Sequence, residues 1–309
     1  MNKKHLLGIS EISKKDIEEI FETADRLKSL SLSDLPLAKK TIALFFEKPS
    51  LRTRVSFFVA SYQLGGNAIE LTPDQIKPGG RETLEDIARN LSLWVDVLVA
   101  RTFKHFTIQR LAKNSSIPVI NALYDIEHPC QALADFYTIR KYLLNTKKNW
   151  NDIKLAFVGD GNNVCHSLML TAALLGTKMS VVGPAKFRPL KRILSKCSKL
   201  NQTFEMTMTE DIGAGVKDAD FIYTDVWASM GQENERDIRI PFFKKYQVNR
   251  NLFSIANPDA KFMHCLPAHR GEEVTDDVLD GKSSVALEQA ENRLHIQKSL
   301  LYLLAGGKK

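Results

Sequence analysis

Cysteine is scarce in this chain. Its 309 residues include only Cys130, Cys165, Cys197 and Cys265, none of which stands in a C-x-x-C pair. Four cysteines without paired spacing are too few for the disulfide framework of a secreted domain, and they do not make a cysteine-based zinc motif. We therefore expect a reducing compartment and predict a cytoplasmic location.

Long apolar runs are also missing. No stretch approaches about 18 consecutive apolar residues, the length that a membrane-spanning helix needs. The first ten residues, MNKKHLLGIS, contain only a very short apolar segment before charged residues resume, which is not the pattern of a signal peptide. We expect no association with a membrane.

Neither sign of charge is concentrated in one place. The 43 Lys and Arg residues exceed the 36 Asp and Glu residues, for a net charge of +7, but the two kinds are interspersed along the chain. A nucleic-acid-binding protein usually gathers its basic residues into a patch or an arm, so we expect no nucleic acid partner. A site for small anionic substrates explains the excess equally well.

The chain does contain a regular alternation of short β-forming runs and helical patterns. Eight runs are predicted to be strands, at residues 41–46, 67–72, 96–103, 117–123, 153–160, 179–184, 220–227 and 261–267. Strands that alternate with helices form parallel sheets, so the fold class is α/β, with two doubly wound parallel-sheet domains joined by interdomain helices. A polar stretch, LNTKKNWND, places the boundary between residues 1–143 and residues 144–286.

Helices are predicted at both ends of the chain. Residues 13–30 place apolar side chains on one face, with Ser13 and Asp16 as a capping box, which is typical of a packing helix. Residues 286–307 read as one long helix that ends in a pair of glycines.

The segment FFEKPSLRTR, residues 45–54, joins a predicted strand to a predicted helix. Ser50 and Thr53 can cap the first backbone N–H groups of that helix. Those N–H groups and the helix dipole favour an anion, and the guanidinium groups of Arg52 and Arg54 match phosphate oxygens. We interpret the segment as a phosphate-binding turn; the alternative is an ordinary capped helix with solvated arginines.

Three more polar residues of the first half follow predicted strands. Arg101 ends one strand, while His128 and Gln131 lie past the next one, three residues apart, so that both can face one point. Ligands of open parallel sheets bind outside the carboxyl ends of the strands. A lone histidine is more often structural, but the position of His128 at another strand end favours a functional role.

GDGNNV, residues 159–164, follows a predicted strand and opens a helix. It suggests a dinucleotide-binding turn, but the third glycine of G-x-G-x-x-G is absent and no clear acidic residue ends a strand about 20 residues later. Asn162 and Asn163 can instead offer amide hydrogen bonds to a polar substrate.

Two further motifs end strands in the second half. DVWASMGQE begins with Asp225, a carboxylate suited to a cationic amine. HCLP begins with His264 and contains a candidate cis peptide bond at Leu266–Pro267. His264 and Cys265 also suggest zinc, but further ligands at zinc-like spacing are missing, so we expect no metal.

In order along essentially the whole chain, PSLRTR, RT after a strand, HPCQ, GDGNN, DVWASMG, HCLP and AENR resemble the aspartate/ornithine carbamoyltransferase family. The D-x-x-x-S-M-G and H-C-L-P motifs are similar to those of its ornithine-specific branch. The resemblance implies that residues 1–143 bind carbamoyl phosphate, that residues 144–286 bind L-ornithine, and that helix 287–305 packs back on the first domain.

The activity implied by the resemblance is transfer of the carbamoyl group of carbamoyl phosphate to the δ-amine of L-ornithine. The products are L-citrulline and phosphate, in arginine metabolism. Carbamoyl phosphate is already activated, so neither a cofactor nor a covalent intermediate is expected. The family's catalytic unit implies a homotrimer or a multiple of trimers.

The resemblance also assigns individual residues. The carbamoyl phosphate set is Ser50, Leu51, Arg52, Thr53, Arg101, His128, Gln131, Cys265, Leu266 and Arg293. The ornithine set is Asn163, Asp225, Ser229 and Met230. The residues implied in catalysis are Arg52, Thr53, Arg101, His128, Asp225 and Cys265.

Two departures from the family pattern are visible. Leu51 replaces the first threonine of the usual S-T-R-T; little is lost if this position acts through its backbone N–H, whereas phosphate affinity falls if the hydroxyl matters. The loop at residues 74–82 also differs from the family form, which puts in doubt whether it reaches a neighbouring subunit.

Three alternatives stay open. A sister enzyme would carbamoylate aspartate, putrescine or an N-acylated ornithine, although Asp225 has the wrong charge for the second carboxylate of aspartate. GDGNNV taken alone would fit a dinucleotide-dependent oxidoreductase. A non-catalytic protein would bind carbamoyl phosphate without turnover.

Overall fold

The computed structural model describes residues 3–28, 35–72, 82–228 and 233–306. The chain divides into two compact units, Met1–Tyr137 with Glu291–Lys309, and Thr138–Ala290. Two helices, α6 (Pro129–Thr146) and α13 (Ala286–Leu301), each begin in one unit and end in the other, which confirms the predicted interdomain helices. The units divide within α6, earlier than the polar stretch suggested, because a continuous helix leaves no break in composition.

The first unit contains a parallel four-stranded sheet. Its strands are β1 (Thr41–Phe46), β2 (Asn67–Leu71), β3 (Val97–Arg101) and β4 (Val119–Leu123), in the order β2-β1-β3-β4. All residues of β3 and β4 are buried, as expected for a parallel sheet covered on both faces. Leu6 pairs with Ile120 in a single parallel bridge, so the N-terminal segment lies along the outer edge of β4.

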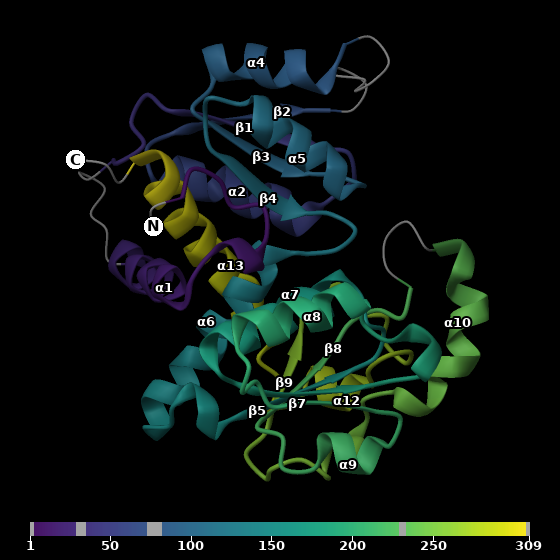
Figure 1. Cartoon of the computed structure of the whole chain (residues 1–309). Helices are drawn as coiled ribbons and strands as arrows, with labels where there is room; N and C mark the ends of the chain where they lie inside the picture. The colour runs from purple at the N-terminus through teal and green to yellow at the C-terminus, as the bar shows by residue number, and fades with distance from the viewer. Residues whose placement is uncertain (1–2, 29–34, 73–81, 229–232, 307–309) are drawn as a thin grey trace. The chain divides into compact units, whose positions relative to one another are not determined.

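Helices cover both faces of this sheet. They are α1 (Lys14–Lys28), α2 (Leu51–Gln63), α4 (Leu84–Trp94) and α5 (His105–Asn114), with the C-terminal part of α13. Figure 1 shows α4 and α5 on one side and α1 and α13 on the other. Phe45 and Leu98 belong to the core cluster formed with α4 and α5. The capping box of α1 is present, since Ser13 Oγ accepts from the Asp16 N–H and Asp16 Oδ2 accepts from the Ser13 N–H.

The second unit contains a parallel five-stranded sheet. Its strands are β5 (Lys154–Val158), β6 (Lys178–Val182), β7 (Met206–Thr209), β8 (Phe221–Thr224) and β9 (Lys261–His264), in the order β7-β6-β5-β8-β9. The sequence predicted four of these and missed β7. That strand, MTMT, has only four residues, lies at the edge and is not fully buried, so it lacks a continuous apolar run.

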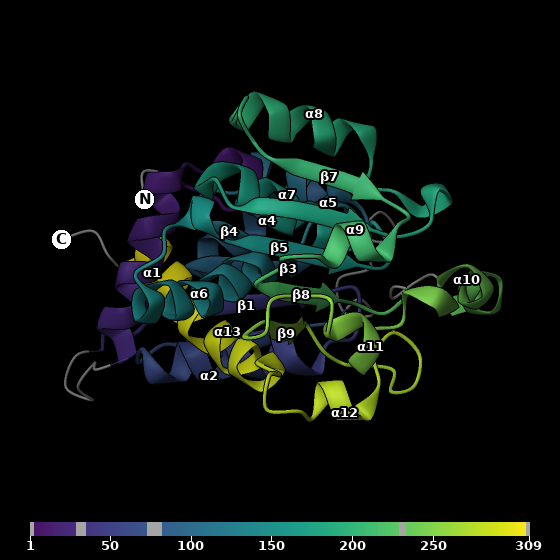
Figure 2. The same ribbon diagram turned by 90° about the horizontal axis from the view of Figure 1, so that it is seen from below.

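The helices of the second unit are α7 (Asn163–Leu175), α8 (Lys191–Leu200), α9 (Ile212–Val216), α10 (Arg236–Phe243), α11 (Arg250–Phe253) and α12 (Asp276–Leu279). Within this unit, α7 and α8 lie on one side of the sheet and α9 and α12 on the other (Figure 1). Figure 2 shows α11 next to α12, and both contribute to the same core cluster as α9. α7 is buried almost all round, which suits its apolar sequence.

The predicted long C-terminal helix ends earlier than expected. α13 stops at Leu301 and is followed by a wider helical turn, Tyr302–Gly306. Among the described helices, none is both long and apolar enough to cross a membrane.

Candidate functional site

The turn after β1 leads directly into α2. Ser50 has an extended backbone (φ −158°), and the helix starts at Leu51, so the first N–H groups of α2 belong to the predicted phosphate-binding residues. These groups have no partner within a helix and, with the helix dipole, favour an anion. The prediction that the Ser50 side chain caps the helix is wrong: in the described chain it makes no capping hydrogen bond.

The side chains of this turn differ in what they contact. The Leu51 side chain is 74% exposed, so this position can act on a ligand through its backbone N–H. Arg54, which the sequence suggested as a second phosphate ligand, instead pairs with Glu70 of β2, with Nη2 2.5 Å from Oε2. Arg52, in the first turn of α2, is half-buried.

Thr53 and Arg293, 240 residues apart in the chain, are hydrogen-bonded. The Arg293 Nη2 of α13 donates to the Thr53 Oγ1 of α2. Both side chains are buried. The structure therefore brings Arg293 of the AENR motif into contact with Thr53, in the first turn of α2.

Arg101 and His128 lie at the same end of the first sheet. Arg101 is the last residue of β3 and is paired in register with Phe46, the last residue of β1. His128 directly precedes α6 and is buried. Burial, and then the positive charges of Arg293 and Arg101, hold the pKa of His128 well below its usual value. At neutral pH His128 is therefore an uncharged imidazole that can form hydrogen bonds next to two cations.

Gln131 is oriented by a residue that sequence reasoning missed. Its Nε2 donates to Asp135 Oδ1 at 2.8 Å, and both residues are buried in the first turns of α6. The Gln131 Oε1 is buried and has no hydrogen-bond partner among the described residues. This amide oxygen is thus an acceptor for a ligand N–H.

Lys48 is a second residue that sequence reasoning missed. It lies in the turn between β1 and α2, is buried, and has its Nζ 4.8 Å from the centre of the Phe103 ring. Lysine side chains are rarely buried, so the residue type alone did not suggest a buried position. The sequence signal that could have identified Lys48 was its place within FFEKPSLRTR. It adds a positive charge near the start of α2.

In the second sheet the strand order reverses between β5 and β8. The chain runs outward from β5 to β6 and β7 on one side, and β8 and β9 lie on the other. Open α/β sheets bind ligands outside the carboxyl ends of the strands at such a point. GDGNN follows β5 and Asp225 follows β8, so both motifs meet there.

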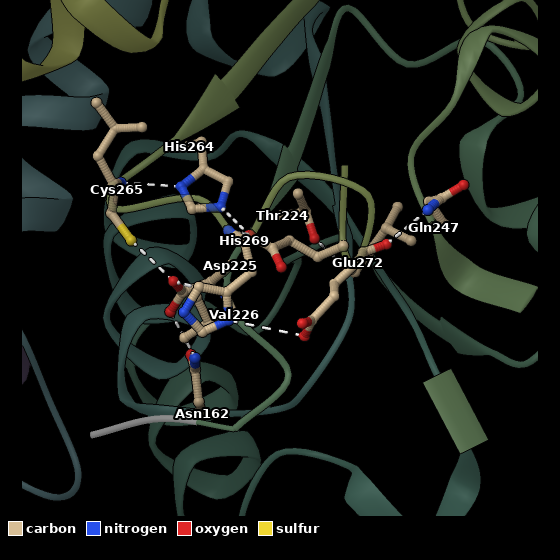
Figure 3. Close-up of polar contacts among 12 residues, drawn as sticks. Asn162, Thr224, Asp225, Val226, Gln247, His264, Cys265, His269 and Glu272 are labelled. Carbon is tan, nitrogen blue, oxygen red and sulfur yellow. Dashed lines mark hydrogen bonds and ion pairs between the residues drawn. The ribbon is translucent and has the colours of Figure 1, made fainter. Parts of the chain in front are cut away.

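The Asp225 carboxylate is held by three donors. Asn162 Nδ2 donates to its Oδ2 at 2.7 Å, while Cys265 Sγ and the Val226 N–H donate to its Oδ1 at 3.0 and 2.9 Å. Figure 3 shows the Cys265 thiol and the Asn162 amide approaching this carboxylate from different sides. Asp225 is buried, and these three donors fix the orientation of its carboxylate at the strand ends.

Of the two neighbouring asparagines, Asn162 contacts Asp225. Its Oδ1 also accepts the N–H groups of Val164 and Cys165, which makes it the N-cap of α7. Asn163, the predicted ornithine ligand, is the first residue of that helix and is half-buried. Ser229 and Met230 lie outside the described residues, as does most of the loop at residues 74–82.

The HCLP turn is organised by the His264 side chain. Leu266–Pro267 is cis, as predicted. The Leu266 N–H donates to His264 Nδ1 at 2.9 Å, so Nε2 carries the ring hydrogen and donates to Glu273 Oε1 at 3.1 Å. His264 and Glu273 are fully buried, and the turn between them presents Cys265 to Asp225.

Two groups of potential metal ligands occur in the described part of the chain: Asp225, His264 and Cys265, and His269, Glu272 and Glu273. In the first group both ring nitrogens of His264 form hydrogen bonds and the Cys265 thiol donates to Asp225. In the second, Glu272 pairs with Arg236 and Glu273 accepts from His264. Both groups are therefore internal hydrogen-bond networks.

Comparison with known proteins gives matches along the whole chain. Residues 4–141 match the aspartate/ornithine carbamoyltransferase carbamoyl-P binding domain, and residues 151–304 match the Asp/Orn binding domain of that family. The chain is 47% identical to the ornithine carbamoyltransferase of Methanosarcina acetivorans over 305 residues, covering 98% of this chain and 99% of that protein. It is 44% identical to that of Archaeoglobus fulgidus over 306 residues, covering 98% of each.

Solved structures of similar proteins match equally well. The ornithine carbamoyltransferase of Pyrococcus furiosus superposes with a TM-score of 0.93 at 45% identity, covering 99% of this chain and 98% of that one. The anabolic ornithine carbamoyltransferase of Campylobacter jejuni gives a TM-score of 0.93 at 36% identity, covering 99% and 100%.

Proposed function

This chain belongs to the aspartate/ornithine carbamoyltransferase family, and we propose how its residues carry out the reaction of the ornithine-specific enzymes. The enzyme transfers the carbamoyl group of carbamoyl phosphate to the δ-amine of L-ornithine, which gives L-citrulline and phosphate in arginine metabolism. In the reaction the amine nitrogen forms a bond to the carbonyl carbon, and the bond from that carbon to the phosphate oxygen breaks.

The observation that carries the choice of ornithine is the buried Asp225 carboxylate, held by Asn162 and Cys265. A fixed negative charge binds the ammonium group of ornithine and repels a second carboxylate, so it favours ornithine over aspartate. Relatives named ornithine carbamoyltransferase, matched over nearly the full length, support the same choice.

In this proposal, the first unit binds carbamoyl phosphate. The phosphate lies at the N-terminus of α2, bound by the N–H groups and side chains of the residues from Ser50 to Thr53, with Arg293 beside them. Helix N-termini and guanidinium groups are suited to this anion. The family model matched by residues 4–141, named for carbamoyl-P binding, supports residues 1–143 with helix 287–305 as this domain.

The carbamoyl group is bound by residues in the first turn of α2, at the end of β3 and past the end of β4. Thr53, Arg101 and His128 donate to its carbonyl oxygen, which gains negative charge as the amine attacks. Because His128 is neutral, it donates a hydrogen bond without adding a third positive charge beside Arg101 and Arg293. The free Gln131 Oε1 accepts from the carbamoyl NH₂ group, an inference supported by its orientation by Asp135.

The second unit, residues 144–286, binds ornithine. Asp225 orients the amino acid together with Asn163, Ser229 and Met230, while the family resemblance assigns Cys265 and Leu266 to carbamoyl phosphate. The δ-amine attacks only when unprotonated, and its pKa in water is about 10.4 by analogy with lysine. Desolvation in the site lowers that pKa, and the leaving phosphate accepts the proton lost by the amine. No covalent intermediate is needed, since positioning two substrates in line supplies much of the rate.

We also propose that the enzyme works in the cytoplasm as a homotrimer or a multiple of trimers. Large apolar side chains are exposed on one face of α2, at Leu51, Val55 and Tyr62, and at the end of α4, at Leu93 and Trp94. Exposed apolar patches of this kind are typical of subunit interfaces. The four free cysteines agree with a reducing compartment.

The test of the function is carbamoylation of L-ornithine, putrescine, N-acetylornithine and L-aspartate by the purified protein, with carbamoyl phosphate and no added metal or nucleotide. We expect strong preference for ornithine. Turnover of aspartate or putrescine at a comparable kcat/KM would reject the ornithine assignment, and carbamoyl phosphate binding without turnover would indicate a binding protein.

A further inference from the structure

One guanidinium group in the second unit is hydrogen-bonded to three separate segments. Arg239 lies in α10 and is 7% exposed. Its Nη1 donates to Asp160 Oδ2 at 2.8 Å and to the Trp227 carbonyl oxygen at 3.2 Å, and its Nε donates to Glu235 Oε2 at 2.9 Å. Asp160 belongs to the loop after β5, Trp227 to the segment after β8, and Glu235 to the turn before α10.

Arg239 is buried beside an aromatic ring, so its guanidinium group depends on these hydrogen bonds. A buried guanidinium has lost its hydrogen bonds to water, so removal of its partners would leave a buried charge without compensation. One face of the group is covered by Phe187, whose ring centre lies 4.8 Å from the guanidinium carbon. Burial raises the pKa of Asp160 to about 6, while the charge of Arg239 opposes that rise.

The contacts of Arg239 flank the Asn162–Asp225 pair. Asp160 stands two residues before Asn162, and Trp227 stands two residues after Asp225. The loops that carry Asn162 and Asp225 are therefore both hydrogen-bonded to the Arg239 guanidinium group, which is planar and directs its N–H donors in fixed directions. A shift of one loop relative to the other would lengthen or break the 2.7 Å hydrogen bond from Asn162 to Asp225.

We propose that Arg239 is a positioning residue for the amino-acid substrate, which keeps the loops after β5 and β8 at the spacing that aims Asp225 at the substrate amine. This inference rests on the proposed binding of ornithine at Asp225. Arg239 acts through Asp160 and the Trp227 carbonyl, and its effect falls on ornithine binding rather than on carbamoyl phosphate.

The first experiment compares Arg239→Gln with Arg236→Gln by steady-state kinetics with ornithine and carbamoyl phosphate. Both arginines belong to α10, but Arg236 is about half exposed and pairs with Glu272. We expect Arg239→Gln to raise the KM for ornithine about ten- to a hundredfold, with the KM for carbamoyl phosphate little changed. Arg236→Gln should keep both constants near those of the wild type.

A double-mutant cycle shows whether the effect passes through the ion pair. Asp160→Asn should also raise the KM for ornithine, and the double variant should be less affected than the product of the two single effects predicts. Arg239→Lys keeps the charge but lacks the fork, so it should recover only part of the ornithine affinity.

Two results would overturn the proposal. If Arg239→Gln lowers Tm while the KM for ornithine stays at the wild-type value, the ion pair has only a structural role. If Arg239→Gln does not fold, the soluble variants Arg239→Lys and Asp160→Asn decide, and an unchanged ornithine KM in both rejects the proposal. Wild-type protein that forms no citrulline would instead reject the proposed function itself.

Discussion

Arg52 lies in the first turn of α2. In the proposed reaction, the leaving phosphate is bound there and its charge increases. Arg52→Ala should therefore lose transition-state stabilisation as well as binding, with kcat lower by about a hundred- to a thousandfold. Steady-state kinetics with saturating ornithine measures this. Arg54→Ala is the matched control, because Arg54 pairs with Glu70 on the surface. An unchanged kcat in Arg52→Ala would rule out the role assigned to Arg52.

In the proposed site, Asp225 supplies the negative charge that binds ornithine. Asp225→Asn keeps the shape of the side chain but removes its charge. The KM for ornithine should therefore rise at least about tenfold, which is the effect of losing one hydrogen bond to a charged group. The KM for carbamoyl phosphate, measured in the same assay, should change much less. Equal increases in both constants would contradict the assignment of Asp225 to ornithine.

His128 should make the stability of the protein depend on pH. Its native pKa lies well below 6.5, so below pH 6.5 the unfolded chain binds a proton that the native protein does not. Stability from this group is complete above pH 6.5 and is lost as the pH falls, by up to about 1.4 kcal/mol per pH unit. Urea unfolding at pH 7.5 and 5.5 should show a smaller acid loss in His128→Asn than in the wild type; parallel losses would contradict this account.

At the scale of elements, two adjacent asparagines at the start of α7 have different roles, although the sequence does not distinguish them. Asn162 caps the helix through two backbone N–H groups, whereas Asn163 is its first residue. Asn162→Ala should lower the free energy of unfolding by at least about 1 kcal/mol, because it removes the cap and a partner of Asp225.

The control for this prediction is Asn163→Ala, which keeps the cap. It should leave the unfolding midpoint closer to that of the wild type and act mainly on the KM for ornithine. Comparable loss of stability in the two variants, measured by urea unfolding, would show that capping does not distinguish them.

Local signals predicted most elements but not all of their details. The apolar runs that became β1, β3 and β5 are short, continuous and bounded by polar turns, so their strand state follows from local composition. β7 has no such run, and it is a strand because its backbone is hydrogen-bonded to β6 in a parallel pair. Ser50 has the residue type and backbone of an N-cap, yet its side chain does not cap, because side-chain direction is not specified by residue type.

At the scale of the whole molecule, the exposed apolar faces of α2 and α4 predict how the enzyme assembles. Tyr62 is 80% exposed and Trp94 71% exposed. The double variant Tyr62→Glu/Trp94→Glu places two charges in the proposed interface and should shift the protein from trimer towards monomer in light scattering after size exclusion. Leu144→Glu, at an exposed position of α6, is the control and should remain trimeric. A wild-type mass equal to one chain would reject the trimer.

The sequence by itself determined the α/β class, the positions of the motifs after strand ends, and the family. These properties depend on local composition and on the order of motifs along the chain, and neither of these depends on how the chain folds. It also predicted the cis bond at Leu266–Pro267, because a proline in HCLP stands in a tight turn.

Only the tertiary structure decided which of these residues meet. The neighbouring positions of β5 and β8 bring Asn162, rather than Asn163, to Asp225, and the return of α13 brings Arg293 to Thr53. Burial beside two arginines sets the charge state of His128. Such contacts join segments up to 240 residues apart, and their energies come from packing and desolvation, which no local stretch of sequence contains.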